Sequence, residues 1–324
     1  MFRGERLDAL WHRAGVDRQP VVGSLGAGDV YLSGQAEDCD SARIAGHVIR
    51  TPTTIYPDVF VPLHGAHQGD NASIALTAAG GRRLVTAARE RGVLLTVFHN
   101  RRWDGDLRTL QRLLDADALG SVHRFESRFE RWRPALRPGA WRESERPEAG
   151  GGLLLDLGSH LVDQALLLFG QPRSVHAEVD RRRAGVQSDD DVFIALEHPG
   201  GVRSHLWASS LAAQVGPRLR VLGDRGAYVK HGLDVQEELL RAGRRPTEPG
   251  WGREPQERWG WLGVDGEARR VETEPGAYQL FYAGLAEALT SGGLPPVDPN
   301  DAVVGLGVLD AARQSAASGT TVRV

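Results

Sequence analysis

An acidic residue and a histidine four positions apart are the side chains of this sequence best suited to proton transfer. Asp156 and His160 follow three glycines, residues 150–152, in a segment where leucine and valine recur at helical spacing. Residues four apart on a helix project from one face, about one turn from each other. A nearby carboxylate fixes the imidazole tautomer and raises its basicity, which suits a group that removes a proton from a substrate hydroxyl. The pattern predicts either this pair or a capped core helix with a buried, hydrogen-bonded histidine.

Composition limits the class of protein. The chain has 324 residues, 41% of them apolar, and a net charge of −3, so it can form about two domains with a sizeable core. The absence of a basic block or of an apolar run near about 18 residues predicts no nucleic-acid partner and no membrane partner. No signal peptide follows Met1, so we expect a cytoplasmic protein. The single cysteine, Cys39, excludes intrachain disulfides and thiolate zinc clusters, and no metal site is predicted.

Periodicity predicts the elements that must position the Asp156–His160 segment. A helix over residues 76–91, ended by Gly92, precedes a buried strand over 93–98. Further helices are expected over residues 106–117, 154–168, 278–290 and 299–317, and strands over 121–131, 174–182, 190–197, 202–210, 218–223 and 226–230. The last five strands alternate in polarity and are separated by turns, which predicts an antiparallel sheet. Residues 243–262 are expected to form a loop rich in arginine and tryptophan.

Polar and aromatic residues follow the buried strand directly, in residues 99–104. In an open parallel sheet, ligands bind at the carboxyl ends of strands, so these side chains are candidates for a site. The alternative is a surface loop with a cation–π pair.

The first 75 residues are harder to interpret. The glycines of residues 23–28 have the wrong spacing for a dinucleotide fingerprint and predict a turn before a strand over residues 29–32. The string at residues 63–68, followed by Asn71, resembles the junction before the C-terminal domain of folylpolyglutamate synthase, over about residues 45–75. That resemblance implies an ATP site at His67 and Asn71, but the phosphate-binding loop that such a ligase needs is missing.

From residue 76 to the end, the chain resembles the Gfo/Idh/MocA oxidoreductases. The resemblance rests on the strand leading into residues 99–103, on Trp141 and Arg142, and on the glycines before Asp156, His160 and Asp163. Residues 193–229 continue it, and residues 228–237 and 249–252 resemble the subgroup that contains NADP-dependent scyllo-inositol dehydrogenases.

The resemblance implies an enzyme that moves hydride between NADP or NAD and a sugar or cyclitol. It implies that His160 accepts the proton and that Asp156 is its partner and anchors the substrate. Other residues of the matching motifs become candidates for substrate binding (Arg102, Trp103, Asp163 and Lys230) and for cofactor binding (Asn100, Arg101, Trp141 and Arg142).

The expected architecture is an α/β chain with an α+β C-terminal part. An incomplete or atypical Rossmann-like N-terminal domain precedes a large, open-faced, mainly antiparallel sheet domain with helices on one side. We expect an atypical segment in residues 1–75 that replaces most of the Rossmann half. A remnant of the dinucleotide-binding domain follows in 76–120, and a substrate and oligomerisation domain in 121–324, its last helix packing back on the N-terminal domain.

The departures from the family pattern leave alternatives open. No G-x-G-x-x-G turn precedes residue 76. The lysine of the Glu-Lys-Pro motif is also missing, because Lys230 is the only lysine. The chain is therefore expected to be an oxidoreductase impaired in its cofactor half, a non-catalytic sugar-binding or scaffold protein, or a fragment of an ATP-dependent folate ligase. An apolar sheet face over residues 174–230 predicts a homo-oligomer, either a dimer or a tetramer.

Overall fold

The computed structural model describes residues 77–136, 146–147 and 150–324, together with the backbone of four strands nearer the N-terminus. These strands are β1 (Pro20–Leu25), β2 (Gly28–Ser33), β3 (Ile49–Arg50) and β4 (Ile55–Tyr56). The strand expected over residues 29–32 is therefore confirmed as part of β2. The predictions made for His67, Asn71, Trp141 and Arg142 lie outside the described residues.

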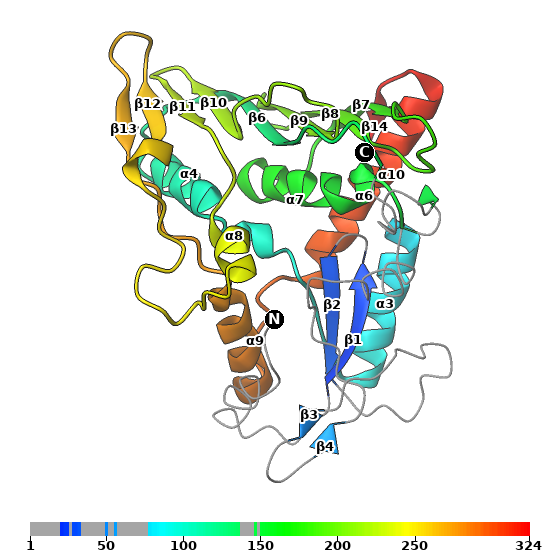
Figure 1. The fold of residues 1–324 in the computed structure, drawn as a ribbon. Coiled ribbons are helices and arrows are strands. Elements are labelled where there is room, and N and C mark those ends of the chain that lie inside the picture. Colours follow the sequence, from blue (N-terminus) through cyan, green and yellow to red (C-terminus); the bar gives the residue numbers. More distant parts are fainter. Residues whose placement is uncertain are drawn as a thin grey trace.

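A nine-stranded sheet forms one layer of the molecule, in the order β13-β12-β11-β10-β6-β9-β8-β7-β14 (Figure 1). Its strands are β6 (Val122–Glu130), β7 (Ser174–Asp180), β8 (Asp191–Glu197), β9 (Arg203–Ser209), β10 (Leu219–Gly223), β11 (Ala227–Lys230), β12 (Gly260–Gly263), β13 (Arg269–Val271) and β14 (Val322–Arg323). Neighbouring strands are antiparallel except β6 and β9, which are parallel. The five antiparallel strands expected between residues 174 and 230 are thus confirmed.

The described helices lie on one side of this sheet (Figure 1). The covering helices are α4 (Gly105–Asp115), α6 (Leu153–Asp156), α7 (Gly158–Phe169) and α10 (Pro299–Ser318). Strand β8 shows why one face is covered, because Val192, Ile194 and Leu196 are buried while the residues between them are half-buried. This alternation gives each strand an apolar face toward the helices. The predicted open-faced sheet with helices on one side is confirmed.

Helix α3 (Ala78–Arg91) and strand β5 (Leu94–Val97) lead into the site region. The hydroxyl of Thr77 caps α3 by accepting a hydrogen bond from the Gly80 amide, and Gly92 ends the helix at φ 65°. This left-handed conformation favours glycine. Strand β5 pairs with β2, and the pair is antiparallel. The expectation that residues 99–104 follow a strand is met, but the described neighbour of that strand does not form a parallel sheet with it.

The last two helices confirm their predicted positions. Helix α9 (Gln279–Ser291) precedes α10, in which Pro299 occupies the first turn and the Asp298 carboxylate caps the helix through the Asn300 amide. Helix α10 packs against both β7 and α3, and its Asp310 carboxylate accepts a hydrogen bond from the Ala78 amide at 2.9 Å. Within the described part of the chain, no helix is both long and apolar enough to cross a bilayer.

Two local predictions need correction. The segment predicted as one loop over residues 243–262 contains the 3-10 turn η4 (Gln256–Arg258) and most of β12, and helix α8 (Gln236–Arg241) precedes it. These elements are too short to produce a clear hydrophobic period. The single helix predicted over residues 154–168 is divided at Leu157 into α6 and α7.

Candidate functional site

Helix α7 and the 3-10 helix η2 (Asn100–Trp103) together hold most of the predicted site residues. Strand β5 ends just before η2, so His99 and η2 lie beside the N-terminal half of α7. Gln164 of α7 donates a hydrogen bond from Nε2 to the Arg101 carbonyl at 3.1 Å. Arg102 donates from Nε and Nη2 to the Asp163 carboxylate, at 2.9 and 2.6 Å. These contacts fix η2 against α7.

Asp156 and His160 lie on the two sides of the break between α6 and α7. Asp156 is the last residue of α6 and is half-buried, whereas His160 lies in the first turn of α7 and is 9% exposed. The backbone remains nearly helical across the break, because the Leu157 amide donates to Leu153 and the Leu161 amide donates to Leu157. The two side chains are therefore still about one turn apart, as the spacing predicted.

His99 is a buried imidazole of this region that was assigned no role from the sequence. Its side chain lies edge-on to His160, with ring centroids 5.8 Å apart and an interplanar angle of 81°. Its Nε2 atom is 3.9 Å from Oδ1 of Asp163. Burial lowers the pKa of His99 and outweighs the opposing charge of Asp163, so the imidazole is neutral near pH 7. The sequence included it only among the site candidates of residues 99–104, because these residues follow the buried strand.

Arg102 and Asp163 were both predicted to bind substrate, and the structure brings them together as an ion pair. Arg102 also donates to Asp301 of α10 at 2.9 Å. The Arg102 guanidinium therefore links η2, α7 and α10. A bidentate arginine–carboxylate pair of this kind holds both side chains in a defined geometry.

Arg101, predicted to bind cofactor, is part of a second ionic network on the other side of η2. Its guanidinium donates to Glu237 at 2.6 Å and to the Tyr278 hydroxyl at 3.2 Å, and it lies over the Phe129 ring. Tyr278 in turn donates to Asp104 at 2.8 Å. Burial raises the pKa of Asp104 well above its ordinary value, and the charge of Arg101 opposes this shift. Asn100 is buried at the first residue of η2.

Residues 234–237 are part of the motif that suggested the inositol dehydrogenase subgroup. Their side chains form hydrogen bonds with the backbone at the end of η2 and the start of α4. Gln236 donates from Nε2 to the Trp103 carbonyl at 3.2 Å, and its Oε1 accepts from the Tyr278 amide at 2.8 Å. Asp234 accepts from the Gly105 amide at 2.7 Å. The side chain of Trp103, a predicted substrate-binding residue, packs edge-on against Phe281. No spacing rule in the sequence indicates these contacts, because their partners are 42 or more residues apart.

Lys230, also predicted to bind substrate, has its ammonium group engaged within the protein. Its side chain is 1% exposed, and Nζ is 3.1 Å from Oε1 of Glu254. It also donates to the His231 carbonyl at 2.8 Å. The lysine thus lies at the end of β11 in a buried ion pair.

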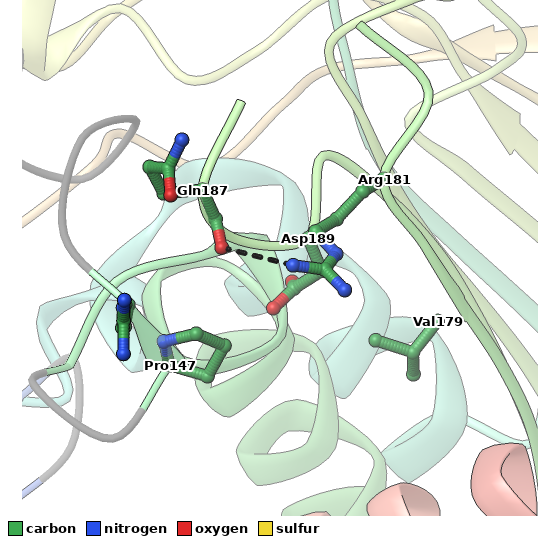
Figure 2. A pocket seen from close by; sticks show the side chains of 6 residues that line it. Pro147, Val179, Arg181, Gln187 and Asp189 are labelled. Carbon is green, nitrogen blue, oxygen red and sulfur yellow. Dashed lines mark hydrogen bonds between the residues drawn. The ribbon is translucent and has the colours of Figure 1, made fainter. Parts of the chain in front are cut away.

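A separate cavity of about 420 Å³ lies at the start of α6 (Figure 2). Its lining residues are Arg146, Pro147, Val179, Arg181, Gln187 and Asp189. Asp189 accepts a hydrogen bond from the Leu154 amide at 2.6 Å, and burial raises its pKa. A side chain at Gly152, where φ is 100°, would collide with the Asp189 carboxylate, which explains the need for glycine there. The cavity shares no described lining residue with the His99, His160 and Asp163 cluster.

Comparison with known proteins relates this arrangement to one family. The family described as GFO/IDH/MocA C-terminal domain matches residues 107–229, from α4 to β11. The scyllo-inositol 2-dehydrogenase (NADP(+)) IolW of Bacillus subtilis (strain 168) is 34% identical over 262 residues, which cover 80% of this chain and 72% of the relative. The uncharacterized oxidoreductase YdgJ of Escherichia coli (strain K12) is 39% identical over 281 residues, covering 83% and 78%.

Solved structures agree with these relatives. The oxidoreductase yvaA of Bacillus subtilis superposes with a TM-score of 0.72 at 33% identity, covering 77% of this chain and 71% of that chain. None of the matches reported above supports the predicted likeness of residues 45–75 to folylpolyglutamate synthase, so that interpretation is withdrawn. The sequence relatives, the matched domain and the superposed fold together show that this chain belongs to the Gfo/Idh/MocA family of oxidoreductases.

Proposed function

We propose that this protein oxidises a hydroxyl group of a sugar or cyclitol and transfers the hydride to NADP or NAD. The observation that carries the proposal is the position of His160 at the start of α7, one turn from Asp156 and beside the fixed η2 segment. A relative named as an NADP-dependent scyllo-inositol 2-dehydrogenase, 34% identical, supports the choice of substrate class and cofactor.

The described residues have defined tasks in this reaction. His160 takes the proton of the substrate hydroxyl, and Asp156 stabilises the imidazolium that results and anchors the substrate. The Arg102–Asp163 pair keeps η2 and α7 at a fixed separation, so that substrate and imidazole meet in one geometry. Arg101 and Lys230, whose charged groups are engaged within the protein, and Trp103, which packs against Phe281, would act by shaping the walls of the site.

The described residues fit the nicotinamide end of the cofactor better than its phosphates. Asn100 supplies a buried amide next to His99, a group that is able to hydrogen-bond a carboxamide. When bound, the nicotinamide ring supplies the hydride acceptor. We propose that Trp141 and Arg142 supply further contacts to the cofactor. Residues 1–75 lack the G-x-G-x-x-G turn that holds the pyrophosphate in this family, so we expect cofactor binding to be impaired.

A ligand titration tests the proposal. The purified protein is titrated with NADPH, NADH and, as a control nucleotide, ATP, and its melting temperature is followed. At 100 times its Kd, a ligand that binds only the folded state stabilises it by about 2.7 kcal/mol. We expect NADPH or NADH to raise the melting temperature, and scyllo-inositol with the oxidised cofactor to yield reduced cofactor. Silence with every nucleotide would favour a non-catalytic sugar-binding protein, and a response to ATP alone would contradict the proposal.

We further propose that the uncovered face of the sheet forms a homo-oligomer, either a dimer or a tetramer. Phe193, His205 and Trp207 form a half-exposed aromatic cluster on β8 and β9, and the Arg128 guanidinium lies 3.9 Å from the Trp207 ring centroid. Aromatic residues and arginine are enriched in interfaces. Light scattering at micromolar concentration should give at least twice the chain mass, and Trp207→Glu should reduce it. A monomeric wild-type protein would contradict this expectation.

A further inference from the structure

His99 takes no part in the proposed reaction. The side chain is 4% exposed, and its Nδ1 atom is buried with no hydrogen-bond partner. Leaving a buried polar atom without a partner is unfavourable. Such atoms are rare in folded proteins, and each one needs an explanation. Here the atom belongs to an imidazole in direct contact with the proposed proton acceptor.

The surroundings of His99 determine which of its nitrogens carries the proton. Nε2 faces the Asp163 carboxylate at 3.9 Å, and Arg102 and Asp301 complete the charged groups around the ring from η2 and α10. A carboxylate attracts the N–H of a neutral imidazole, so the proton resides on Nε2. The Nδ1 atom then presents a lone pair and acts as an acceptor. Asp163 therefore favours this tautomer of His99 through its charge, at a separation longer than a hydrogen bond.

The neighbour that can supply a donor is His160. The two ring planes are nearly perpendicular and their centroids are 5.8 Å apart, so a hydrogen bond between the rings needs a rotation of the His160 side chain. A protonated imidazole has two N–H donors. Once His160 has accepted the substrate proton, one of these donors can turn to the Nδ1 lone pair. A hydrogen bond that forms only to the charged state favours that state.

We propose that His99 is a positioning residue that accepts a hydrogen bond from protonated His160 and thereby raises the basicity of the proton acceptor. The inference rests on the proposed function for its role in catalysis, whereas the hydrogen bond itself can be measured without turnover. The Asp163 carboxylate lies near Nε2 of His99, at 3.9 Å. Asp156 on α6 is the other carboxylate near His160 along the chain.

Two substitutions distinguish the role of Nδ1 from that of Nε2 in His99. In His99→Asn the amide oxygen is placed near the position of Nδ1, so an acceptor toward His160 is kept. In His99→Gln the amide reaches the position of Nε2, and the acceptor at Nδ1 is lost. Both side chains are neutral and polar, so each serves as the matched control for the other.

The measurement is an NMR titration of the imidazole nitrogens in protein labelled with nitrogen-15 histidine. The His160 signals are assigned from the spectrum of His160→Ala. We expect His99→Gln to lower the proton affinity of His160 about tenfold and His99→Asn to leave it within about twofold of wild type. The acidic limb of the kcat/KM profile should move to lower pH by the same amount in His99→Gln alone.

Equal shifts in both variants, or no shift in either, would overturn the inference, provided that far-ultraviolet circular dichroism shows each variant folded. A protein that shows the titration shift but never reduces the cofactor would contradict the proposed function and leave the hydrogen bond in place. If the protein is active but His160 titrates identically in wild type, His99→Gln and His99→Asn, the proposed function is supported and the hydrogen bond to His99 is contradicted.

Discussion

Substitution of His160 by alanine is expected to reduce kcat/KM by about 10²- to 10⁴-fold, the usual contribution of a positioned general base. The alanine variant can no longer accept the proton of the substrate hydroxyl. Asp156→Asn should also reduce kcat/KM, because an amide cannot stabilise the imidazolium that forms on His160. Initial rates with scyllo-inositol and the oxidised cofactor, measured across a range of substrate concentrations, test both variants.

A matched histidine on the sheet provides the control. His123 is exposed on β6 and belongs to no part of the proposed site. His123→Ala should therefore keep the wild-type rate, and melting temperatures of all three variants should show that they are folded. If His160→Ala retained the wild-type rate, His160 would be a core histidine and the catalytic assignment would be wrong.

The second large effect is expected at Arg218, a buried arginine directly before β10. Its guanidinium is 3.1 Å from the Asp106 carboxylate, donates to Gln164 at 2.9 Å, and lies over the Phe129 ring. Arg218→Met leaves Asp106 buried without its cation, and breaking a buried pair in this way costs about 3–5 kcal/mol. Urea denaturation should show this loss in the free energy of unfolding.

Arg220, the second residue of β10, is the matched control. It pairs with Glu126, but its side chain is 42% exposed, so Arg220→Met should cost less than about 1 kcal/mol. The double variant Arg218→Met with Asp106→Asn should recover part of the stability lost in Arg218→Met, because no unpaired charge then remains. If both variants lost the same free energy of unfolding, burial would not explain the large effect expected for Arg218→Met.

The fold was predictable where long elements carry a clear period. Helix α3, with its cap at Gly92, and the alternating strands from β7 to β11 follow directly from the spacing of apolar residues. The β12–β13 hairpin and α8 were not predictable in this way, because each spans too few residues for a period and depends on pairing with β11 or packing on η2. The order of strands was equally inaccessible, since β6 and β9 lie far apart in the sequence and pair in parallel.

The candidate site was predictable in its residue types but only partly in its contacts. The spacing of Asp156 and His160 predicted side chains one turn apart, and the motif supplied Asp163 and Arg102 as separate candidates. That Arg102 binds Asp163, and that Arg101 binds Glu237, depends on tertiary packing between α7, η2 and α8. His99 was present in the sequence at the end of a buried strand, but only the structure reveals its contact with His160.

The burial of Lys230 has a practical consequence for experiments on this protein. It is the only lysine of the chain, and its ammonium is enclosed with Glu254 at the end of β11. Amine-reactive dyes and cross-linkers require an accessible, uncharged amine, so Lys230 is protected from them in the native state. Modification of Lys230 becomes possible only when the outer strands of the sheet separate. The rate of modification therefore measures local opening of that edge of the sheet.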